Sequence, residues 1–503
     1  MIKKVFVSCL VIFAGLYVSG QSKQKDIDDY FKALVKNQQF SGSVLVIEND
    51  KIVYESAAGY ADYTTKTPNT TGIRFPIASI SKIFTATAIL QLNEKGKLNI
   101  TDPIIRYLPE FPYPEITIKH LLSHTSGLPP YNAFFDKAKK ESPDKTFTNK
   151  DFMLEVVAHK QPLKYQPGEK GNYDNVNFLV LALIVEKVSG IPYKNFIEKN
   201  ILQPADMAET SLFPLPEQFD GRKIKDFAFP HVYLHFYEAT PVKSNSIPYV
   251  REYWHSYGFN GFADYVSTIR DLWKFDNALY KNTLLKQQTL EEAFVPIKLN
   301  SGETNPDYFG LGWEMEKDTS LGKLVYHSGA AMGLSSNILR NITKRQTVII
   351  FDNAHFNAHE NASKLMMLLN GKKVDMPKRS LAKIYGNTLV GKGVIAANEI
   401  LEKLKKDTAN YYLNEDEMNT LGYDFMGNSN PYHLPQQHLY KLAVETLKKN
   451  VALFQNSWNA YDSYAEALLA NGQKREAIKM YQKSIELNPE NENGKKILEK
   501  LLQ

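Results

Sequence analysis

The chain has 503 residues, of which 43% are apolar and 23% are charged, and its formal net charge is +5. A chain of this length is expected to form two or more domains, and its composition is that of a globular protein. The charge is too small for this length to indicate a nucleic-acid-binding surface.

The first 20 residues have a basic start, an apolar middle and small residues at their end. This pattern predicts a secretory signal peptide over 1–20, cut after Gly20. Its apolar stretch is short for a membrane span and no later stretch is long enough, so we expect no transmembrane segment in the mature chain. The only cysteine, Cys9, lies in this leader, so no thiol chemistry or disulfide is expected after cleavage. The sequence thus predicts an exported protein, periplasmic or extracellular.

The chain then alternates between strand and helix patterns. Residues 26–38 predict a short amphipathic helix, and 40–48 with 51–56 predict a β-hairpin that turns at Asn49-Asp50. Residues 75–90 predict a turn fixed by Pro76 and then a helix that is apolar on most faces, which places it inside the domain. Further helices are expected within 117–129 and at 151–160, 176–189, 264–280 and 288–295, and strands at 310–315, 324–329, 335–339 and 347–352.

Ser79 and Lys82 lie at the start of the expected buried helix, three residues apart and on one helical face. A serine hydroxyl becomes nucleophilic when a nearby amine takes its proton, and burial lowers the pKa of a lysine amine enough for this. A helix N-terminus adds positive potential and N–H donors for a developing oxyanion. Most serines at this spacing only cap a helix, so the hypothesis depends on the apolar run and on motifs downstream.

Two downstream motifs add groups with acid–base and binding chemistry. In the first, a lysine near Tyr173 can lower the pKa of the phenol so that it serves as general base, while Asn175 can bind substrate. The second, His327-Ser328-Gly329, lies on an expected inner strand. A glycine there lets a substrate lie against the strand edge, where backbone N–H groups complete an oxyanion hole. Each motif alone is common, and a lone histidine is more often structural.

Together and in this order, the motifs resemble the serine β-lactamase and penicillin-binding protein family, in particular its branch of class C β-lactamases, D-alanyl-D-alanine carboxypeptidases and family VIII esterases. The resemblance covers about residues 26–370 and includes Phe40-Ser-Gly-Ser-Val-Leu-Val, Leu121-Leu-Ser-His-Thr-Ser-Gly-Leu-Pro129, Gly310-Leu-Gly-Trp313 and His327-Ser-Gly329. It implies a β-lactamase/transpeptidase-like α/β (α+β) fold, with an antiparallel sheet flanked by helices and a helical subdomain. It implies no metal and no organic cofactor.

The resemblance also implies a role for each motif residue. Ser79 would be the acylated nucleophile, Lys82 its activating partner, and Tyr173 the general base and later the acid toward the leaving group. Asn175 would orient the substrate amide. The oxyanion hole would consist of the N–H groups of Ser79 and Ala330.

One motif departs from the family pattern. His327, followed by Ser328 and Gly329 at the substrate-binding strand, takes the place that lysine holds in class C β-lactamases. A neutral imidazole attracts a substrate carboxylate less than an ammonium does, which weakens the β-lactamase interpretation and favours a peptidase or an esterase. Tyr173 in place of the serine of S-D-N argues against class A enzymes.

The pattern changes near residue 373, where a polar stretch precedes sequence that is helical throughout. The expected organisation is a signal peptide at 1–20, a serine hydrolase domain at 21–372, a linker at 373–380 and an all-α domain at 381–503. Ala443, Leu447 and Asn450 recur 34 residues later as Ala477, Tyr481 and Ser484, which resembles tetratricopeptide repeats, although the earlier unit has a longer turn around 428–434. Such repeats form concave surfaces for proteins or peptides; a domain that only packs against the hydrolase is the alternative.

Two other features have a structural and a functional interpretation. Residues 230–260 are rich in aromatic side chains, which predicts a packed subdomain or, as the second interpretation, a wall of the substrate cleft. His231 with His235, and His355 with His359, have the i, i+4 spacing of zinc ligands on a helix. Neither pair has the glutamate of H-E-x-x-H, so we expect no metal site.

The sequence therefore predicts an exported serine hydrolase that forms an acyl-enzyme on a D-alanyl peptide, a β-lactam or a small ester. Its partner would be a small-molecule or peptide substrate, without nucleic acid or cofactor. One rival hypothesis is a catalytically silent scaffold whose helical repeats recruit a protein. The other is a lipid or small-ester hydrolase.

Overall fold

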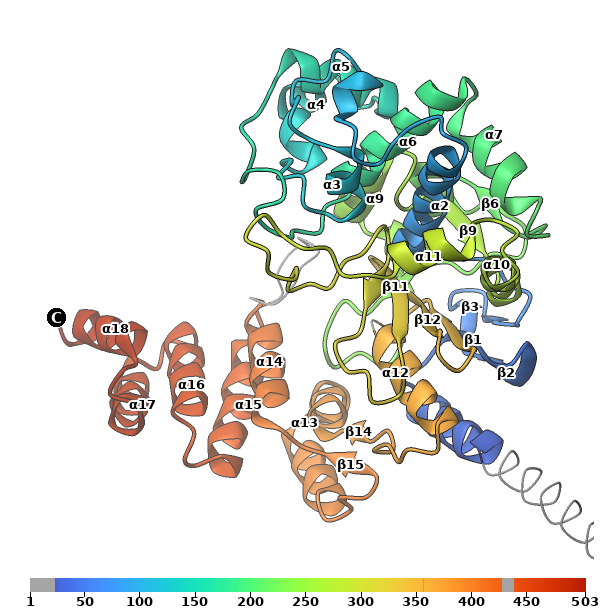
Figure 1. Ribbon diagram of the computed structural model, residues 1–503. Helices are drawn as coiled ribbons and strands as arrows, with labels where there is room; N and C mark the ends of the chain where they lie inside the picture. The colour runs from blue at the N-terminus through green and yellow to red at the C-terminus, as the bar shows by residue number, and fades with distance from the viewer. Residues whose placement is uncertain (1–22, 356, 428–437) are drawn as a thin grey trace, which may run out of the picture. The chain divides into compact units, whose positions relative to one another are not determined.

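The computed structural model describes residues 23–355, 357–427 and 438–503 (Figure 1). The predicted signal peptide and the predicted turn around 428–434 lie outside the described residues. The chain divides into two compact units, one of Met1–Val232 with Lys243–Asp375 and one of Tyr233–Val242 with Met376–Gln503. The short segment Tyr233–Val242 thus belongs to the second unit although it lies within the first in sequence.

A six-stranded sheet forms the centre of the first unit, in the order β10-β11-β12-β13-β1-β2. Its strands are β1 (Gly42–Glu48), β2 (Lys51–Ala58), β10 (Glu314–Met315), β11 (Leu324–Ala331), β12 (Leu334–Asn341) and β13 (Gln346–Asp352). Every neighbouring pair is antiparallel, and β1 pairs with β13 from Gly42 opposite Asp352 to Glu48 opposite Gln346. This confirms the predicted antiparallel sheet whose strands come from both ends of the region.

Alternating side chains of β1 enter two different cores, because successive residues of a strand face opposite sides of the sheet. Val44 and Val46 pack with the helix of residues 23–36 and with α12 (Ala358–Leu369). Leu45 and Ile47 belong to the larger core on the other face, which contains α2 (Ser81–Glu94) and α10 (Ile269–Tyr280). Helices therefore cover both faces of the sheet, as predicted (Figure 1).

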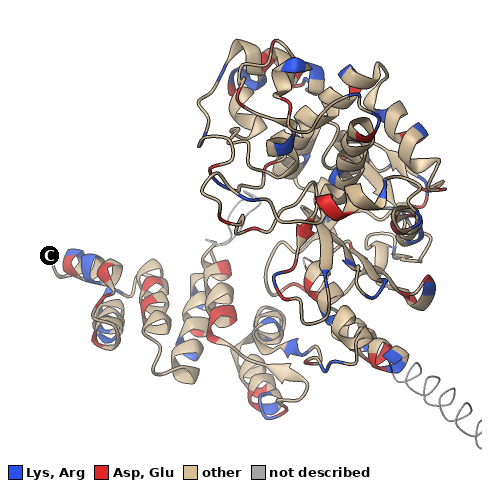
Figure 2. Cartoon of the chain, viewed as in Figure 1, with Lys and Arg blue, Asp and Glu red and all other residues tan. Residues whose placement is uncertain are grey.

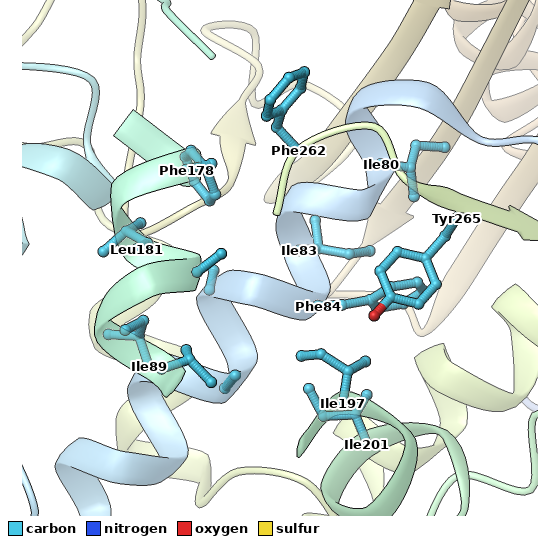
Figure 3. Close-up of a cluster of buried hydrophobic side chains, with 14 of the residues drawn as sticks. Ile80, Ile83, Phe84, Ile89, Phe178, Leu181, Ile197, Ile201, Phe262 and Tyr265 are labelled. Atoms are coloured by element: carbon cyan, nitrogen blue, oxygen red, sulfur yellow. The ribbon is translucent and has the colours of Figure 1, made fainter. Parts of the chain in front are cut away.

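Helix α2 is buried on nearly every face, from Ser81 to Leu92. Its side chains Ile83 and Phe84 lie among residues of α6 (Val176–Ser189) and of the segment that follows it (Figure 3). Burial on all sides fixes the helix in position, so the residues at its start are held rigidly. The predicted buried helix is confirmed.

The remaining helices of the first unit are α3 (Ile118–Leu122), α4 (Asp136–Glu141), α5 (Asn149–Ala158), α7 (Tyr193–Ile197), α8 (Leu215–Asp220), α9 (Pro248–Ser256) and α11 (Gln287–Ala293). Several of them gather with α6 beyond α2 as the expected helical subdomain (Figure 1). Short strands include β5 (Phe75–Pro76), β7 (His231–Val232) and β9 (Tyr265–Ser267).

Two segments differ from the prediction. The expected helix at 264–280 begins only at Ile269, because the residues before it form β9 and pair with β5. The expected strand at 310–315 is a strand only at Glu314–Met315. Gly312 has a φ of +81°, and a Cβ on it would lie 2.3 Å from the Cβ of Ala86 in α2. Close approach to α2 therefore replaces strand pairing in this segment.

The described residues of the second unit form α13 (Leu381–Leu404), α14 (Glu415–Met426), α15 (Tyr440–Leu453), α16 (Trp458–Ala470), α17 (Lys474–Leu487) and α18 (Glu492–Leu502). Helix α13 is interrupted by a kink at Gly393, where φ is +82°. The second unit also holds one short parallel pair, β14 (Arg379–Ser380) with β15 (Tyr411–Tyr412). The predicted helical C-terminal region is confirmed.

Residues at the predicted repeat positions are all shielded from solvent in the second unit. The three in α15 and the three in α17 are buried: Ala443, Leu447, Asn450, Ala477, Tyr481 and Ser484. Equivalent burial is what a repeated helix pair requires, but the repeat itself stays a prediction.

The segment 233–242 is held in the second unit by specific contacts with α14. The two oxygens of the Asp424 carboxylate contact the Nδ1 of His235 at 3.0 Å and the backbone N–H of Phe236 at 2.7 Å. Tyr237 stacks on Phe425 with ring centroids 5.1 Å apart. Because Asp424 is distant in sequence, nothing in the local pattern of 233–242 predicts this placement.

Charged side chains of both signs are intermixed on the described helices and loops of each unit (Figure 2). Among the described residues, none of the helices alone has the length and hydropathy to cross a membrane. One pair passes such a test only together, Val176–Ser189 with Tyr193–Leu202, and it is bent by 77°.

Candidate active site

Ser79 lies in a tight turn between β5 and α2, next to the amine of Lys82. The preceding residue, Ala78, has a φ of +46°, which is rare for a residue with a Cβ and marks local strain. The Nζ of Lys82 donates a hydrogen bond to the Oγ of Ser79 at 2.9 Å and another to the carbonyl of Phe262 at 3.2 Å. The structure thus brings the predicted nucleophile and its activating amine into direct contact.

The Lys82 side chain is fully buried, with 0% of its surface exposed. Burial lowers the pKa of Lys82 to about 7, against the opposing effect of the carboxylates of Glu314, Asp264 and Asp174. At neutral pH, Lys82 is therefore a neutral amine in a substantial fraction of the protein molecules. Such an amine can take the proton of Ser79.

We expect the catalytic efficiency to rise with pH through about 7, the pKa of Lys82, because only the neutral amine can accept a proton. The measurement is kcat/KM for an uncharged ester as a function of pH. Burial also raises the pKa values of Glu314 and Asp264 to about 7, so a variant is needed to show which group causes the rise of kcat/KM near this pH. In Glu314→Gln the limb should persist and move to lower pH, because the carboxylate that stabilises the ammonium is gone. A profile without a limb in this region would contradict the role of Lys82.

Tyr173 lies in the loop before α6, with its ring 4.8 Å from the Nζ of Lys82. Burial raises the pKa of Tyr173 above its usual value, and a hydrogen bond with Ser79 acts in the opposite direction. The expected lowering of the Tyr173 pKa is therefore wrong, because burial of the phenol outweighs the hydrogen bond that would lower it. Tyr173 is a neutral phenol beside the nucleophile, and 39% of its surface remains exposed to the cleft.

His124 holds the Tyr173 loop, a role that the sequence did not predict. Its ring lies 4.4 Å from the Tyr173 ring, and its Nδ1 accepts hydrogen bonds from the backbone of Asp174 at 3.2 Å and from Asn177 at 3.1 Å. Burial lowers the pKa of His124 well below its usual value, so the ring is neutral. The only signal was its place in the signature stretch 121–129.

The predicted binding strand β11 passes beside Ser79. Strand β10 pairs only with Val325 and Tyr326, so within the described residues the positions 327–331 have a strand partner on the β12 side alone. This leaves one edge of β11 open at the cleft, and Ser328 and Ala330 line it.

Gly329 is needed for a different reason from the one predicted. A Cβ on Gly329 would lie 2.3 Å from the carbonyl oxygen of Ile77, in the turn that carries Ser79. The glycine therefore lets β11 approach this turn, whereas the sequence interpretation assigned the space to substrate.

His327 is 2% exposed and does not line the cleft, although it lies near Tyr173, with ring centroids 6.4 Å apart. Its Nδ1 donates to the carbonyl of Ser328 at 2.7 Å, so the Nε2 of the neutral ring is an acceptor. Burial, and then the charge of Lys82, lower the pKa of His327 to about 3. The ring is thus neutral, as expected for this position, but it is buried behind the cleft lining and not exposed to substrate.

Two cavities meet at Ser79. An apolar pocket of about 250 Å³ is lined by Pro76, Ala78, Ser79, Tyr131, Asn175, Leu215, Gln218, Phe219, Pro230, Trp254, Phe262, Ala263, Ala330, Ala331, Met332 and Leu334. A wider groove of about 930 Å³ is lined by Ser79, Tyr173, Asn175, Ser328, Ala330 and residues of 306–318 and 326. Asn175 lines both, and its buried Oδ1 has no hydrogen-bond partner among the described residues.

Aromatic residues of 230–260 are found both in packed regions and in the wall of the cleft, the two interpretations given from the sequence. Trp254 lines the apolar pocket, whereas Tyr257 is buried against Tyr131 at a ring distance of 5.0 Å. Phe236 and Tyr237 belong to the second unit.

The four histidines checked for metal binding have other contacts. His231 accepts from the backbone of Tyr63 at 3.2 Å, and His235 contacts Asp424 in the second unit. His355 contacts Asp352 at 3.2 Å, and His359 lies 3.2 Å from Glu316. The part of the chain that the structure describes contains no group of three or more His, Cys, Asp or Glu placed to hold a metal ion.

Residues 27–369 match the model of the Beta-lactamase family. The chain belongs to this family. It is 35% identical over 362 residues to penicillin-binding protein 4* of Bacillus subtilis (strain 168), covering 71% of this chain and 79% of that protein. It is 32% identical over 355 residues to the putative penicillin-binding protein PbpX of the same strain, covering 70% and 80%.

A solved structure also shares the fold. The penicillin-binding protein from Bacillus halodurans superposes with a TM-score of 0.56 at 26% sequence identity, covering 68% of this chain and 98% of that chain. These matches confirm the predicted β-lactamase-like fold and family, and they support a serine hydrolase type of enzyme.

Proposed function

We propose that this protein is an exported serine hydrolase that cleaves an amide or an ester through an acyl-enzyme on Ser79. One observation carries the proposal: the Nζ of a buried lysine lies 2.9 Å from the Oγ of Ser79, and burial lowers the pKa of that lysine, Lys82, to about 7. Burying a lysine lowers the stability of the protein, because the charged amine loses its hydration. A catalytic role for Lys82 explains why the protein has a lysine at this position.

The proposed reaction has two steps. Lys82 takes the proton of Ser79 as the Oγ attacks the substrate carbonyl, and the N–H groups of Ser79 and Ala330 stabilise the oxyanion. The phenol of Tyr173 passes a proton to the departing nitrogen or oxygen as its bond to carbon breaks. Water then releases the acyl group from Ser79. Asn175, with its unpartnered Oδ1, orients the substrate at the junction of the two cavities.

The position of Tyr173 separates the two sides of the substrate. Tyr173 lines the wide groove but not the apolar pocket, so the departing group lies in the groove and the acyl group in the pocket. Side chains such as Trp254, Phe219 and Leu215 suit an apolar acyl group. The neutral His327 favours a peptidase or an esterase over a β-lactamase.

We expect kcat/KM for nitrophenyl esters to rise by about fourfold for each added methylene of the acyl chain, until the pocket is full. The expected gain follows from burying each methylene among the apolar residues of the pocket. The measurement compares acetyl, propionyl, butyryl and hexanoyl esters with one constant leaving group. A fall in kcat/KM with chain length from acetyl onward would contradict this assignment of the pocket.

The chemical test of the function is to trap the acyl-enzyme. A slowly deacylating ester should add the mass of its acyl group to the protein, and the adduct should map to Ser79. Turnover of esters and amides that persists in Ser79→Ala at the level of the parent would refute the mechanism.

The export part of the proposal is supported by the leader pattern of residues 1–20 and by relatives that are penicillin-binding proteins. We expect the protein recovered outside the cytoplasm to start after Gly20. Recovery of only full-length protein from the cytoplasm would contradict export.

A further inference from the structure

The groove that holds the departing group differs in charge from the rest of the site. It carries four carboxylates and one ammonium, from Asp307, Glu314, Glu316, Asp318 and Lys317. The Nζ of Lys317 lies 5.2 Å from the ring of Tyr308. The side chain and the backbone N–H of Ser320 donate to Asp318, which lowers its pKa and keeps it ionised.

Glu314 and Glu316, two of the other three carboxylates, differ from Asp318 in their surroundings. Burial raises the pKa of Glu314 to about 7, so its charge is complete only at higher pH. Glu316 lies 3.2 Å from the Nε2 of His359. The groove therefore stays negative at neutral pH and becomes more negative above it.

Among the described residues that line the groove, Lys317 is the one cationic side chain, against four carboxylates. His327 is neutral and its Nε2 is an acceptor, and the pKa of Lys82 is lowered to about 7. A carboxylate on the departing group would meet like charges along the groove. An ammonium there would be attracted by them.

We propose that the groove selects a departing amine or alcohol that carries a positive charge. The substrate is then an amide or an ester with an apolar acyl part and a cationic departing part. This inference rests on the proposed function and names the substrate class of the same site.

The chemistry of the step balances without another reactant. The Oγ of Ser79 forms a bond to the acyl carbon, and the bond from that carbon to the departing nitrogen or oxygen breaks. Lys82 takes the proton of Ser79, Tyr173 gives its own proton to the departing atom, and Lys82 returns a proton to Tyr173. The positive group lies elsewhere on the departing part and takes no part in the bond changes, so it contributes only through its attraction to the carboxylates.

The test uses three phenylacetyl esters that differ only in the charge of the departing alcohol. They are the choline ester, the neohexyl ester with carbon in place of the quaternary nitrogen, and the ester of β-hydroxypropionic acid. Phenylacetate release is measured at low ionic strength and about pH 8, above the pKa values of about 7 of Lys82 and Glu314. We expect kcat/KM for the choline ester to exceed that for the neohexyl ester by about tenfold, with the anionic ester slowest.

Variants then locate the effect. The ratio of kcat/KM for the choline ester to kcat/KM for the neohexyl ester should fall toward one in the double variant Asp318→Asn with Glu316→Gln. It should stay at the parental value in Glu303→Gln, because Glu303 is an exposed carboxylate outside the groove lining. The ratio should also fall between about 10 mM and about 1 M salt. Equal rates for the choline and neohexyl esters, or a faster anionic ester, would overturn the proposal and leave the serine hydrolase function intact. If the protein hydrolysed none of the three esters and no other ester or amide, both the charge selectivity and the serine hydrolase function would be overturned.

Discussion

Replacing Ser79 by alanine is expected to lower kcat for ester hydrolysis by about 1,000-fold or more. The variant removes the atom that forms the acyl-enzyme, and Ser79 carries the hydroxyl to which the Nζ of Lys82 donates a hydrogen bond. The fold should persist, because Ser79 is part of a turn fixed by its backbone and α2 remains buried. Steady-state kinetics gives the effect, with circular dichroism to verify the fold.

Ser328→Ala is the matched control for Ser79→Ala. Its Oγ lines the same cleft but accepts its hydrogen bond from Asn337 at 2.9 Å and has no bond with Lys82. Losing one hydrogen bond should cost no more than about tenfold in kcat/KM. If both variants lost activity equally, or if Ser79→Ala kept a tenth of the parental rate, Ser79 would not be the nucleophile.

Replacing Arg340 by methionine is expected to lower the free energy of unfolding of the first unit by about 3–5 kcal/mol. Arg340 on β12 forms an ion pair with Asp276 on α10, and the side chains are only 2% and 3% exposed. The other oxygen of this carboxylate accepts from the Oγ1 of Thr347 at 2.8 Å. Removing the guanidinium leaves a buried carboxylate without its charge partner. Denaturant unfolding followed by near-ultraviolet circular dichroism reports the loss.

Arg345→Met provides the control, because the two arginines share a neighbour and differ in burial. Their guanidinium groups lie 4.7 Å and 5.1 Å from the ring of Tyr280. Arg345 pairs with Asp50, but these side chains are 41% and 43% exposed. The exposed pair should be worth at most about 1 kcal/mol. Equal losses in the two variants would show that the buried charge of Asp276 is not the cause.

Much of the fold follows from local pattern. The turn at Asn49-Asp50 joins two runs of strand-forming residues, and both turn residues have the positive φ that a tight hairpin requires. The run after Ser79 is apolar on most faces, and α2 is indeed buried throughout. Where close approach competes with pattern, as at Gly312 against Ala86, the predicted strand at 310–315 is reduced to Glu314–Met315.

The residues of the site could be selected from the sequence. Ser79, Lys82, Tyr173 and the β11 motif have side chains suited to acyl transfer, and the motifs follow one another in the order that the family shows. The structure brings them together, and their catalytic roles stay proposals. The direction of the Tyr173 pKa was not predictable, since it depends on burial by groups distant in sequence, among them His124. Nor does the local sequence indicate that 233–242 belongs to the second unit, because Asp424 holds it.

The most direct measurement of the proposed chemistry is the intact mass of the purified protein after exposure to a fluorophosphonate, with Ser79→Ala treated alongside. A serine activated by Lys82 should displace fluoride and gain one phosphonyl group. We expect a single adduct on the parent, mapped to Ser79 by peptide analysis, and none on Ser79→Ala. An unmodified parent, or an adduct that persists in Ser79→Ala, would contradict an activated serine at this position.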